Sequence, residues 1–405
     1  MNLSLSIKTL LLIIIITIPL YFDVYTERVF DTSKFLVLVL LTIILAICMS
    51  FDRTKLEFKT PLTYPVLSLW AITSIATVFS VHPLTSFLGG YKRYDGLMSL
   101  TCYVFIYFII VNYVTLRMVK GLCEAIIWVA CITSVYGICQ HYDLDPIAWV
   151  KYDDRVFSTF GHPAFFSAFL GMAIPLVLWR SFAGCRWYLL LLPIILIAFY
   201  YTKTRAAFLG LIISILFFCW IARKTLLTNR KIFAICGIVF VIIFAFNSGP
   251  VIKRFREGVG KNGQITGTAG ARIVFAEVAI EIIKDHPLLG VGPDALGFVY
   301  MKYLKQVHPE QLTGCAQYNQ SRIHNDFLDM AVSRGLIGLA VYIWLIIAFI
   351  RMVWGKCNRL IVAALCAGLL SYIVQNQFSF GHISFIIVNW YYIGMVVVLC
   401  GKEEI

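Results

Sequence analysis

Apolar runs long enough, or nearly long enough, to cross a lipid bilayer recur along the whole chain. The hydrocarbon core of a bilayer is about 30 Å thick, which takes about 20 helical residues to cross. The expected fold class is therefore all-α, a polytopic integral membrane protein with about 12 transmembrane helices. The runs cover residues 7–22, 35–50, 62–80, 97–116, 121–139, 163–179, 187–201, 205–222, 232–247, 335–353, 359–377 and 383–400.

The composition agrees with a membrane protein. Hydrophobic residues make up 60% of the chain and charged residues 14%, which excludes an ordinary soluble globular protein. The first apolar run follows a single Lys8 and carries no small-residue cleavage site, so a retained helix is expected rather than a signal peptide. Of the 12 cysteines only Cys315 falls in the large polar loop, and no Cys-x-x-Cys pair occurs, so neither a disulfide framework nor a zinc site is expected.

The net charge of +13 is mostly a signal of membrane topology. With twelve spans and both termini in the cytoplasm, the inner side takes 16 of the 34 basic residues and only five acidic ones. Short loops then follow the positive-inside rule, from which long loops are exempt. Membrane lipids are expected partners and nucleic acid is not. The chain divides into residues 1–247 with nine spans, one large periplasmic or outer loop at residues 248–324, and residues 325–405 with three spans.

The large outer loop contains an amphipathic helical pattern over residues 271–285, which Pro287 ends. Arg272 falls in the first turn of this expected helix, where free backbone N–H groups already favour an anion. Its guanidinium could hold a phosphate through two hydrogen bonds, or it could pair with Glu277 or Asp285 on the helix surface. The expected apolar stripe consists of Ile273, Ala276, Ile280 and Ile283.

A tight turn at residues 202–205, Thr202-Lys203-Thr204-Arg205, separates two spans on the same outer side. The positive-inside rule applies to loops on the cytoplasmic side, so it does not explain basic residues in this outer turn. Lys203 and Arg205 could extend to lipid headgroups, or together with the threonine hydroxyls they could bind an anion.

An ionisable histidine stands where the outer loop returns to the membrane. The motif reads His324-Asn325, nine residues, Gly335, two residues, Gly338. If the run is helical from the histidine onward, His324 and Gly335 share a face, and the small pair Gly335/Gly338 lets a neighbouring helix approach closely. A neutral imidazole there could accept a proton, with a pKa near ~6.5 if it is unperturbed. A structural hydrogen-bonding histidine is the alternative.

Two further arginines are candidates for contacts with a substrate. Arg93 lies in Tyr91-Lys92-Arg93-Tyr94, a mixture of aromatic and basic residues at the outer interface that suits a headgroup or a sugar. Arg322 lies close to the histidine motif and adds positive charge there.

Four local motifs resemble the O-antigen ligase family, the bacterial polytopic proteins that share the Wzy-type domain. They are Gly89-Gly90 to Asp95-Gly96, Thr202-Lys203-Thr204-Arg205-Ala206, Gly270-Ala271-Arg272, and the motif that starts at His324. The spacing of the spans, and the single long outer loop between the ninth and the tenth, extend the resemblance over most of the chain.

The resemblance implies a fold similar to the membrane glycosyltransferases of the GT-C type. It implies transfer of a glycan from an undecaprenyl-diphosphate carrier to an acceptor on the periplasmic or outer face of the inner membrane, without a nucleotide sugar, a metal or another cofactor. The family's two loop arginines correspond to Arg205 and Arg272, and its histidine corresponds to His324. The substrate-binding candidates are Lys203, Arg322 and Arg93.

The resemblance leaves the acceptor open, because members of this family use different acceptors. The ligase proper attaches O-antigen to a sugar of the lipid A-core, whereas relatives polymerise repeat units or load glycans onto secreted proteins. A transporter for a lipid-linked glycan is the competing class. Transporters usually carry ionisable groups near the bilayer midplane, whereas the charges here fall at the ends of the expected spans. A structural scaffold would leave the outer arginines and the histidine unexplained.

Overall fold

The computed structural model describes residues 3–51, 57–91, 93–149, 154–231, 234, 237–238, 267–307, 309, 320–356 and 359–401. Within these residues the fold is all-helical, with 14 α-helices and three short 3-10 turns. The helices are α1 (Leu3–Leu20), α2 (Thr32–Ser50), α3 (Thr63–Val78), α4 (Pro83–Leu88), α5 (Leu97–Tyr113), α6 (Leu116–His141), α7 (Pro163–Phe182), α8 (Leu191–Tyr201), α9 (Arg205–Thr228), α12 (Gly267–Asp285), α13 (Tyr300–Val307), α14 (Asp326–Val353), α15 (Leu360–Asn376) and α16 (Ile383–Gly401).

Six of these helices are long and apolar enough to cross a membrane, and several shorter apolar helices accompany them. The chain is therefore a polytopic membrane protein. Eleven of the twelve apolar runs in the sequence coincide with a helix. The twelfth run, at residues 232–247, falls largely outside the described residues, as do residues 248–266 of the expected outer loop.

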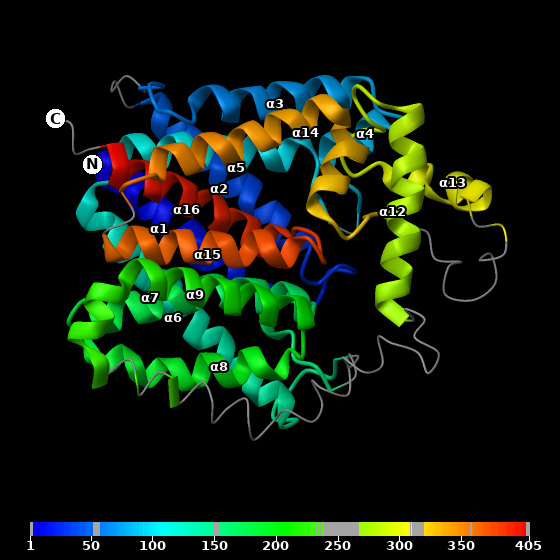
Figure 1. Ribbon diagram of the computed structural model, residues 1–405. Coiled ribbons are helices and arrows are strands. Elements are labelled where there is room, and N and C mark those ends of the chain that lie inside the picture. The colour runs from blue at the N-terminus through cyan, green and yellow to red at the C-terminus, as the bar shows by residue number, and fades with distance from the viewer. Residues whose placement is uncertain are drawn as a thin grey trace.

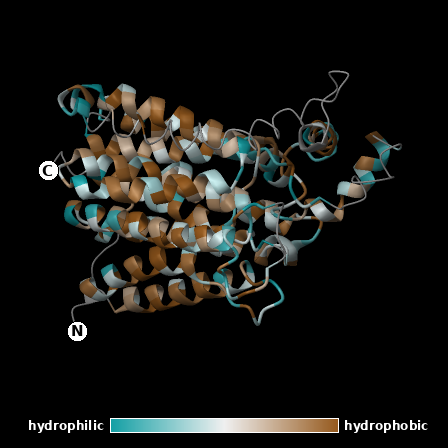
Figure 2. Ribbon diagram, turned by 90° about the horizontal axis from the view of Figure 1, so that it is seen from below, coloured by the Kyte–Doolittle hydropathy of each residue, from teal (hydrophilic) through white to brown (hydrophobic). Residues whose placement is uncertain are grey.

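The apolar helices lie side by side in one bundle, and α12 crosses one end of it (Figure 1). The first turn of α1 and the last turn of α16 lie together at the opposite end. Hydrophobic residues follow the bundle helices along most of their length (Figure 2). At the centre, α7 is almost wholly buried, and α15 packs tightly beside it, since a Cβ atom on Gly171 would come within 2.6 Å of the Ser371 hydroxyl.

The end cap formed by α12, α13 and the start of α14 has a hydrophobic core of its own. Its buried members include Val278, Ile282, Tyr300, Leu304 and Val332. The loop at residues 320–325 joins this core through the buried side chain of Ile323. The cap is therefore a packed element that can hold side chains in fixed positions over the end of the bundle.

The expected details of α12 are wrong in two respects. The helix starts no later than Gly267, so Arg272 lies in its second turn, and the free N–H groups of a first turn do not explain the position of this arginine. The buried stripe is made by Val274, Val278 and Ile282, whereas Ile273 is 46% exposed and Ile280 is 49% exposed. The expected end is confirmed, because α12 stops at Asp285 before Pro287.

The expected helical face shared by His324 and Gly335 is also wrong. His324 precedes the N-cap residue Asn325, and α14 is broken at Gly335, which has φ 70° and ψ −176°. A Cβ atom on Gly335 would lie 2.0 Å from the carbonyl oxygen of Leu288. This glycine therefore permits close approach of the loop that follows α12, and not of a neighbouring helix. A backbone hydrogen bond of 2.7 Å from Leu336 N to Pro287 O fixes that contact.

Candidate functional site

Two connecting segments meet at the end of the bundle that α12 covers. One is the loop at residues 320–325, and the other joins α15 to α16 at residues 377–382. The amide of Asn325 donates to the backbone oxygen of Gln377 at 3.2 Å and to its side-chain oxygen at 3.3 Å. The Asn325 side-chain oxygen also accepts from Leu328 N at 3.0 Å as the N-cap of α14. One asparagine thus fixes both segments and the start of the helix.

His324 sits between two aromatic rings contributed by different elements. Its ring lies 5.6 Å from the ring of Phe275 on α12 in a stacked arrangement, and 4.8 Å from the ring of Phe380 in an edge arrangement. Its backbone is left-handed, with φ 62°. Histidine is among the few non-glycine residue types that tolerate this region. The imidazole is therefore held by packing on both sides and by the turn that precedes α14.

Arg93 also contacts Phe380. The centre of its guanidinium lies 3.7 Å from the centroid of the Phe380 ring, and its Nε donates to the Ser321 hydroxyl at 3.1 Å. The arginine thus contacts both segments that define the site. The fold therefore brings the aromatic and basic segment that contains Arg93 close to His324.

Arg272 reaches from α12 to the loop between α15 and α16. Its guanidinium donates to the carbonyl oxygen of Phe378 at 2.6 Å. Burial lowers the pKa of Arg272, and the positive charge of Arg205 adds to this effect. The like charges of Arg205 and Arg272 therefore interact in a partly desolvated place, which an anionic group would relieve.

Arg322 is buried and already paired inside the protein. Its guanidinium lies 2.5 Å from a carboxylate oxygen of Asp95 and 3.3 Å from one of Asp294, and Asp294 also accepts from Gly90 N at 2.6 Å. Burial alone would lower the pKa of Arg322, but the charges of Asp95 and Asp294 raise it. This arginine ties the Gly90–Asp95 segment to the cap, so a supporting role for the site fits better than direct contact with a substrate.

The turn between α8 and α9 is where the sequence places it. Lys203 has a left-handed backbone, with φ 46°, and Arg205 is the first residue of α9. Arg155, which the motifs did not single out, donates to the backbone oxygen of Thr202 at 2.8 Å and to the hydroxyl of Thr204 at 2.9 Å. It therefore stiffens the turn that positions Arg205.

Burial and the nearby positive charges keep the imidazole of His324 neutral. Burial lowers the pKa of His324 to about 3, and the positive charges of three neighbouring arginines add to this effect. They are Arg93, Arg272 and Arg322. The unperturbed value near ~6.5 therefore does not apply to the free protein. A neutral imidazole surrounded by cations is a ready proton acceptor only when a negative charge arrives beside it.

Two more histidines surround this place. His382 stacks on Phe165 at 4.4 Å, and its Nε2 lies 2.9 Å from a carboxylate oxygen of Asp31. His162 caps α7 by accepting from Ala164 N at 3.1 Å, and burial lowers its pKa to about 3. Each histidine precedes an apolar run that starts on the expected outer side. That shared position in the sequence is the signal that could have found them.

Comparison with known proteins agrees with this arrangement. Residues 188–343 match the family model described as O-antigen ligase. The resemblance is thereby confirmed over a range that contains Arg205, Arg272 and His324.

A curated relative from Haemophilus influenzae, described as an uncharacterized protein, is 26% identical over 201 residues. The aligned region covers 46% of this chain and 48% of the relative. The chain therefore spans about half the length of the curated relative that it matches.

Proposed function

We propose that the protein is an O-antigen ligase-like glycosyltransferase. It moves a glycan from an undecaprenyl-diphosphate carrier to a hydroxyl group of an acceptor, a sugar of the lipid A-core. The observation that carries the proposal is a half-buried neutral imidazole, at His324, which packs against Phe275 and Phe380 and feels the positive charges of Arg93 and Arg272. That combination supplies a proton acceptor and a binding place for a diphosphate at the edge of a membrane domain.

The donor would change the electrostatics of the site on binding. A diphosphate between Arg205 and Arg272 offsets their mutual repulsion and stabilises the negative charge that grows on the leaving group. It also weakens the positive field that holds the pKa of His324 down. His324 thereby becomes a stronger base when the donor is present, so the acceptor is activated only in the productive complex.

The reaction then proceeds as a single displacement at the anomeric carbon. The acceptor oxygen forms a bond to that carbon while its proton passes to His324. The bond from the anomeric carbon to the diphosphate oxygen breaks, and the electron pair leaves with the carrier diphosphate. The arginines stay charged throughout, and the proton later returns to solvent from the imidazole. Positioning of the two substrates supplies a further part of the acceleration.

We also propose an orientation in the bacterial inner membrane. With about 12 spans, residues 248–324 would form one large periplasmic loop, and the site would then lie on the periplasmic face. The excess of basic residues in the opposite loops supports this direction. The ends of α1 and α16, which lie together away from α12, would face the cytoplasm (Figure 1).

An acceptor panel tests the function and separates it from its relatives. The purified protein in lipid vesicles is given one undecaprenyl-diphosphate-linked glycan together with lipid A-core, a second carrier-linked repeat unit, or a pilin-type protein. We expect transfer to lipid A-core. Transfer only to the repeat unit would make the protein a polymerase, and transfer only to the protein would make it a protein O-oligosaccharyltransferase. Movement of intact donor across the vesicle membrane without transfer would make it a transporter.

A further inference from the structure

A pair of ionisable side chains ties two connecting segments together beside the candidate site. Asp31 lies at the start of α2 and His382 directly precedes α16. A carboxylate oxygen of Asp31 lies 2.9 Å from Nε2 of His382, although the two residues are 351 positions apart in the sequence. The connection between α1 and α2 therefore lies beside the connection between α15 and α16 (Figure 1).

The hydrogen bonds of His382 show which of its ring nitrogens carries the proton. Nδ1 accepts from the backbone N of Ser384 at 3.3 Å, and it lies 2.9 Å from the Ser384 hydroxyl. Burial lowers the pKa of His382, which keeps the ring neutral. A ring nitrogen that accepts carries no proton, so the proton of the neutral ring is on Nε2. Nε2 therefore donates to the Asp31 carboxylate, and this bond fixes the orientation of the ring.

Asp31 is a rigid anchor because the start of α2 is itself fixed. Lys34, in the first turn of this helix, is fully buried, and its ammonium group donates to the carbonyl oxygens of Ile18 and Pro19 at 2.8 Å and 2.9 Å. Thr159, in the short turn before α7, donates to the same Pro19 oxygen at 2.7 Å. These bonds join the end of α1, the start of α2 and the turn before α7 into one frame.

The segment that joins α15 to α16 is anchored at both of its ends. Asn325 holds its first residue, and Asp31 holds its last one. The carbonyl oxygen of Phe378, which accepts from Arg272, lies next to the first anchor. Phe380 lies next to the second anchor. The two anchors therefore act on different parts of the site.

His382 and Phe380 pack on the same aromatic ring. His382 stacks on Phe165 at 4.4 Å, and Phe380 meets Phe165 edge-on at 5.3 Å. Phe380 in turn contacts the ring of His324 at 4.8 Å and the guanidinium of Arg93 at 3.7 Å. A rotation of the His382 ring would therefore displace Phe380, and with it the wall that packs against His324.

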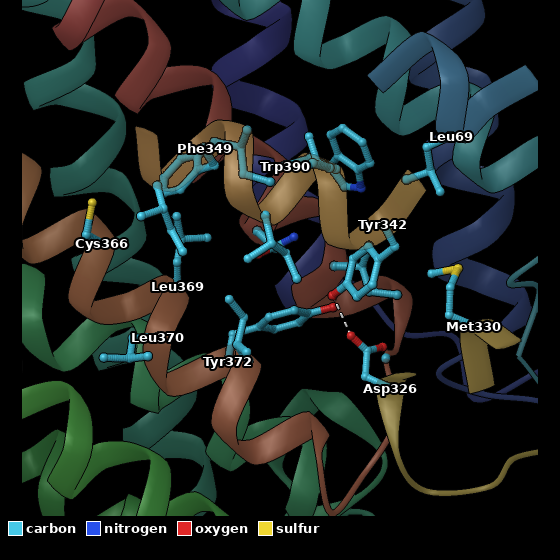
Figure 3. Close-up of a pocket in the computed structure, with 18 of the residues that line it drawn as sticks. Leu69, Asp326, Met330, Tyr342, Phe349, Cys366, Leu369, Leu370, Tyr372 and Trp390 are labelled. Carbon is cyan, nitrogen blue, oxygen red and sulfur yellow. Dashed lines mark hydrogen bonds between the residues drawn. The ribbon is translucent and has the colours of Figure 1, made fainter. Parts of the chain in front are cut away.

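The turn that carries His324 is held by other contacts. Asp329 accepts a hydrogen bond of 2.8 Å from the backbone N of Ile323. Asp326 accepts one of 2.5 Å from Tyr342, 16 residues along α14 (Figure 3). Both bonds are local to this part of the chain, so loss of the aspartate–histidine pair should leave the turn in place while the ring beside it moves.

We propose that Asp31 and His382 are positioning residues for glycan transfer. Neither touches a substrate; together they hold Phe380 against His324, so that the imidazole faces the acceptor hydroxyl. The inference rests on the proposed function, because His324 is the base of that reaction. A misplacement of about 1 Å caused far from the chemistry can slow a reaction by ~10²-fold. Loss of this anchor should therefore affect turnover and not donor binding.

The test separates the position of the anchor from its charge. Asp31→Ala removes the acceptor for Nε2 of His382 and should lower kcat by at least ~10-fold. Donor affinity should stay within ~3-fold, because the contact with Arg272 lies next to the other anchor. Asp31→Asn keeps an oxygen that accepts from Nε2, so its kcat should stay within ~3-fold of wild type.

Two further variants complete the comparison. His382→Asn keeps an acceptor for the backbone N of Ser384 but is too short to reach Asp31, so it should match Asp31→Ala. The matched control is Asp23→Ala in the same connection. Among the described residues the Asp23 carboxylate accepts only from Tyr25 N, at 2.9 Å. This control should change neither turnover nor donor affinity.

A double substitution distinguishes positioning from a general loss of structure. In a Phe380→Ala background, Asp31→Ala should lower kcat further by less than ~2-fold, because the ring that it positions is absent. Rates are expressed per protein that binds donor, which corrects for misfolded protein. A further loss of ~10-fold in the double variant would mean that Asp31 does not act through Phe380, and would overturn the inference.

Amide hydrogen exchange follows the anchor without any reaction. In the segment between α15 and α16 and the first turn of α16, Asp31→Ala should speed exchange by at least ~10-fold, whereas Asp31→Asn and Asp23→Ala should not. Wild-type turnover by Asp31→Ala, or equal losses in Asp31→Asn and Asp31→Ala, would overturn the inference and leave the proposed function in place. Absence of transfer by the wild-type protein to every acceptor would overturn the proposed function, and this inference with it.

Discussion

The chemistry proposed for His324 depends on its neighbours more than on the histidine itself. Phe275 and Phe380 exclude water from two sides of the ring, and Arg93 and Arg272 supply positive charge. A base with its pKa about 3 is weak in the free protein, and a bound diphosphate raises that pKa by offsetting the charges of the arginines. Binding of the donor and activation of the acceptor are thereby linked through charge.

The pH dependence of the reaction should show this link. The lowered pKa means that the imidazole is neutral well above pH about 3 in the free protein. We therefore expect kcat/KM for the donor to be flat from pH 5 to 8, whereas kcat falls on the acidic side with a higher apparent pKa, because the bound diphosphate favours the imidazolium. Initial rates across this range measure both. A fall of kcat/KM with an apparent pKa near ~6.5 would mean that neither burial nor the arginines lower the pKa of His324.

Arg272 should act on the diphosphate through its planar guanidinium. We expect Arg272→Ala to lower transfer by ~10²–10³, as loss of one donor to a developing anion does, and Arg272→Lys to recover only part of it. Lys284→Ala is the matched control, because Lys284 lies on the same helix, is exposed and pairs only with Glu281 at 2.6 Å among the described residues. If both alanine variants kept wild-type rates, Arg272 would be no more than a contact to the Phe378 carbonyl.

Motifs in the sequence could identify His324 and Arg272, since charged residues are rare in so apolar a chain. Phe380 could not be identified in this way, because one aromatic residue among 31 phenylalanines carries no local signal. Arg322 shows the opposite difficulty. Its charge is visible in the sequence, but its pairing is not. The partners Asp95 and Asp294 lie far from Arg322 in the sequence, and only the fold brings them together.

The break of α14 at Gly335 sets the position of the site. The helix turns at Gly335, and the loop after α12 pairs with the broken segment through a hydrogen bond of 2.8 Å from Val291 N to Val332 O. This contact fastens the cap to the membrane helix that follows His324. A glycine motif that suggests helix–helix packing can therefore instead permit the close approach of a loop. The spacing of the glycines alone does not distinguish these two roles.

Replacing Gly335 should test this close contact. Gly335→Ala adds a Cβ atom 2.0 Å from Leu288 O at φ 70° and ψ −176°, a backbone region nearly restricted to glycine, whereas Gly355→Ala adds one in open space at φ 80°. We expect Gly355→Ala to cost about 1–2 kcal/mol and Gly335→Ala clearly more, because backbone must move as well. Thermal unfolding in detergent compares them. Equal losses of stability would mean that the loop contact is unimportant.

The helix α12 shows why hydrophobic periodicity alone does not give the buried face of a helix. Isoleucine and valine occur on both of its faces, so periodicity alone permits two apolar stripes. The stripe with Val278 and Ile282 is buried because α13 and the loop at residues 320–325 pack on that side. Ile273 and Ile280 remain on the exposed side. Tertiary packing chose between two stripes that the sequence leaves nearly equivalent.

Taken as one molecule, the protein joins a bundle of apolar helices to a packed cap at one end. Hydrophobic runs predicted the bundle well, since span length is fixed by the bilayer. The cap could not be predicted, because it depends on contacts between residues distant in the sequence. It meets the segment between α15 and α16 where the rings of His324 and Phe380 lie 4.8 Å apart. We therefore expect one residue at this junction, His324, to control turnover without holding the donor.

The most direct measurement is transfer by His324→Asn in vesicles, with donor binding determined separately. Asparagine tolerates the left-handed backbone at this position, so the turn should be kept while the base is lost. We predict a loss of ~10²–10⁴ in turnover with the affinity for undecaprenyl-diphosphate-linked glycan within a few-fold of wild type. Near-normal turnover, or loss of donor binding in place of turnover, would contradict the account.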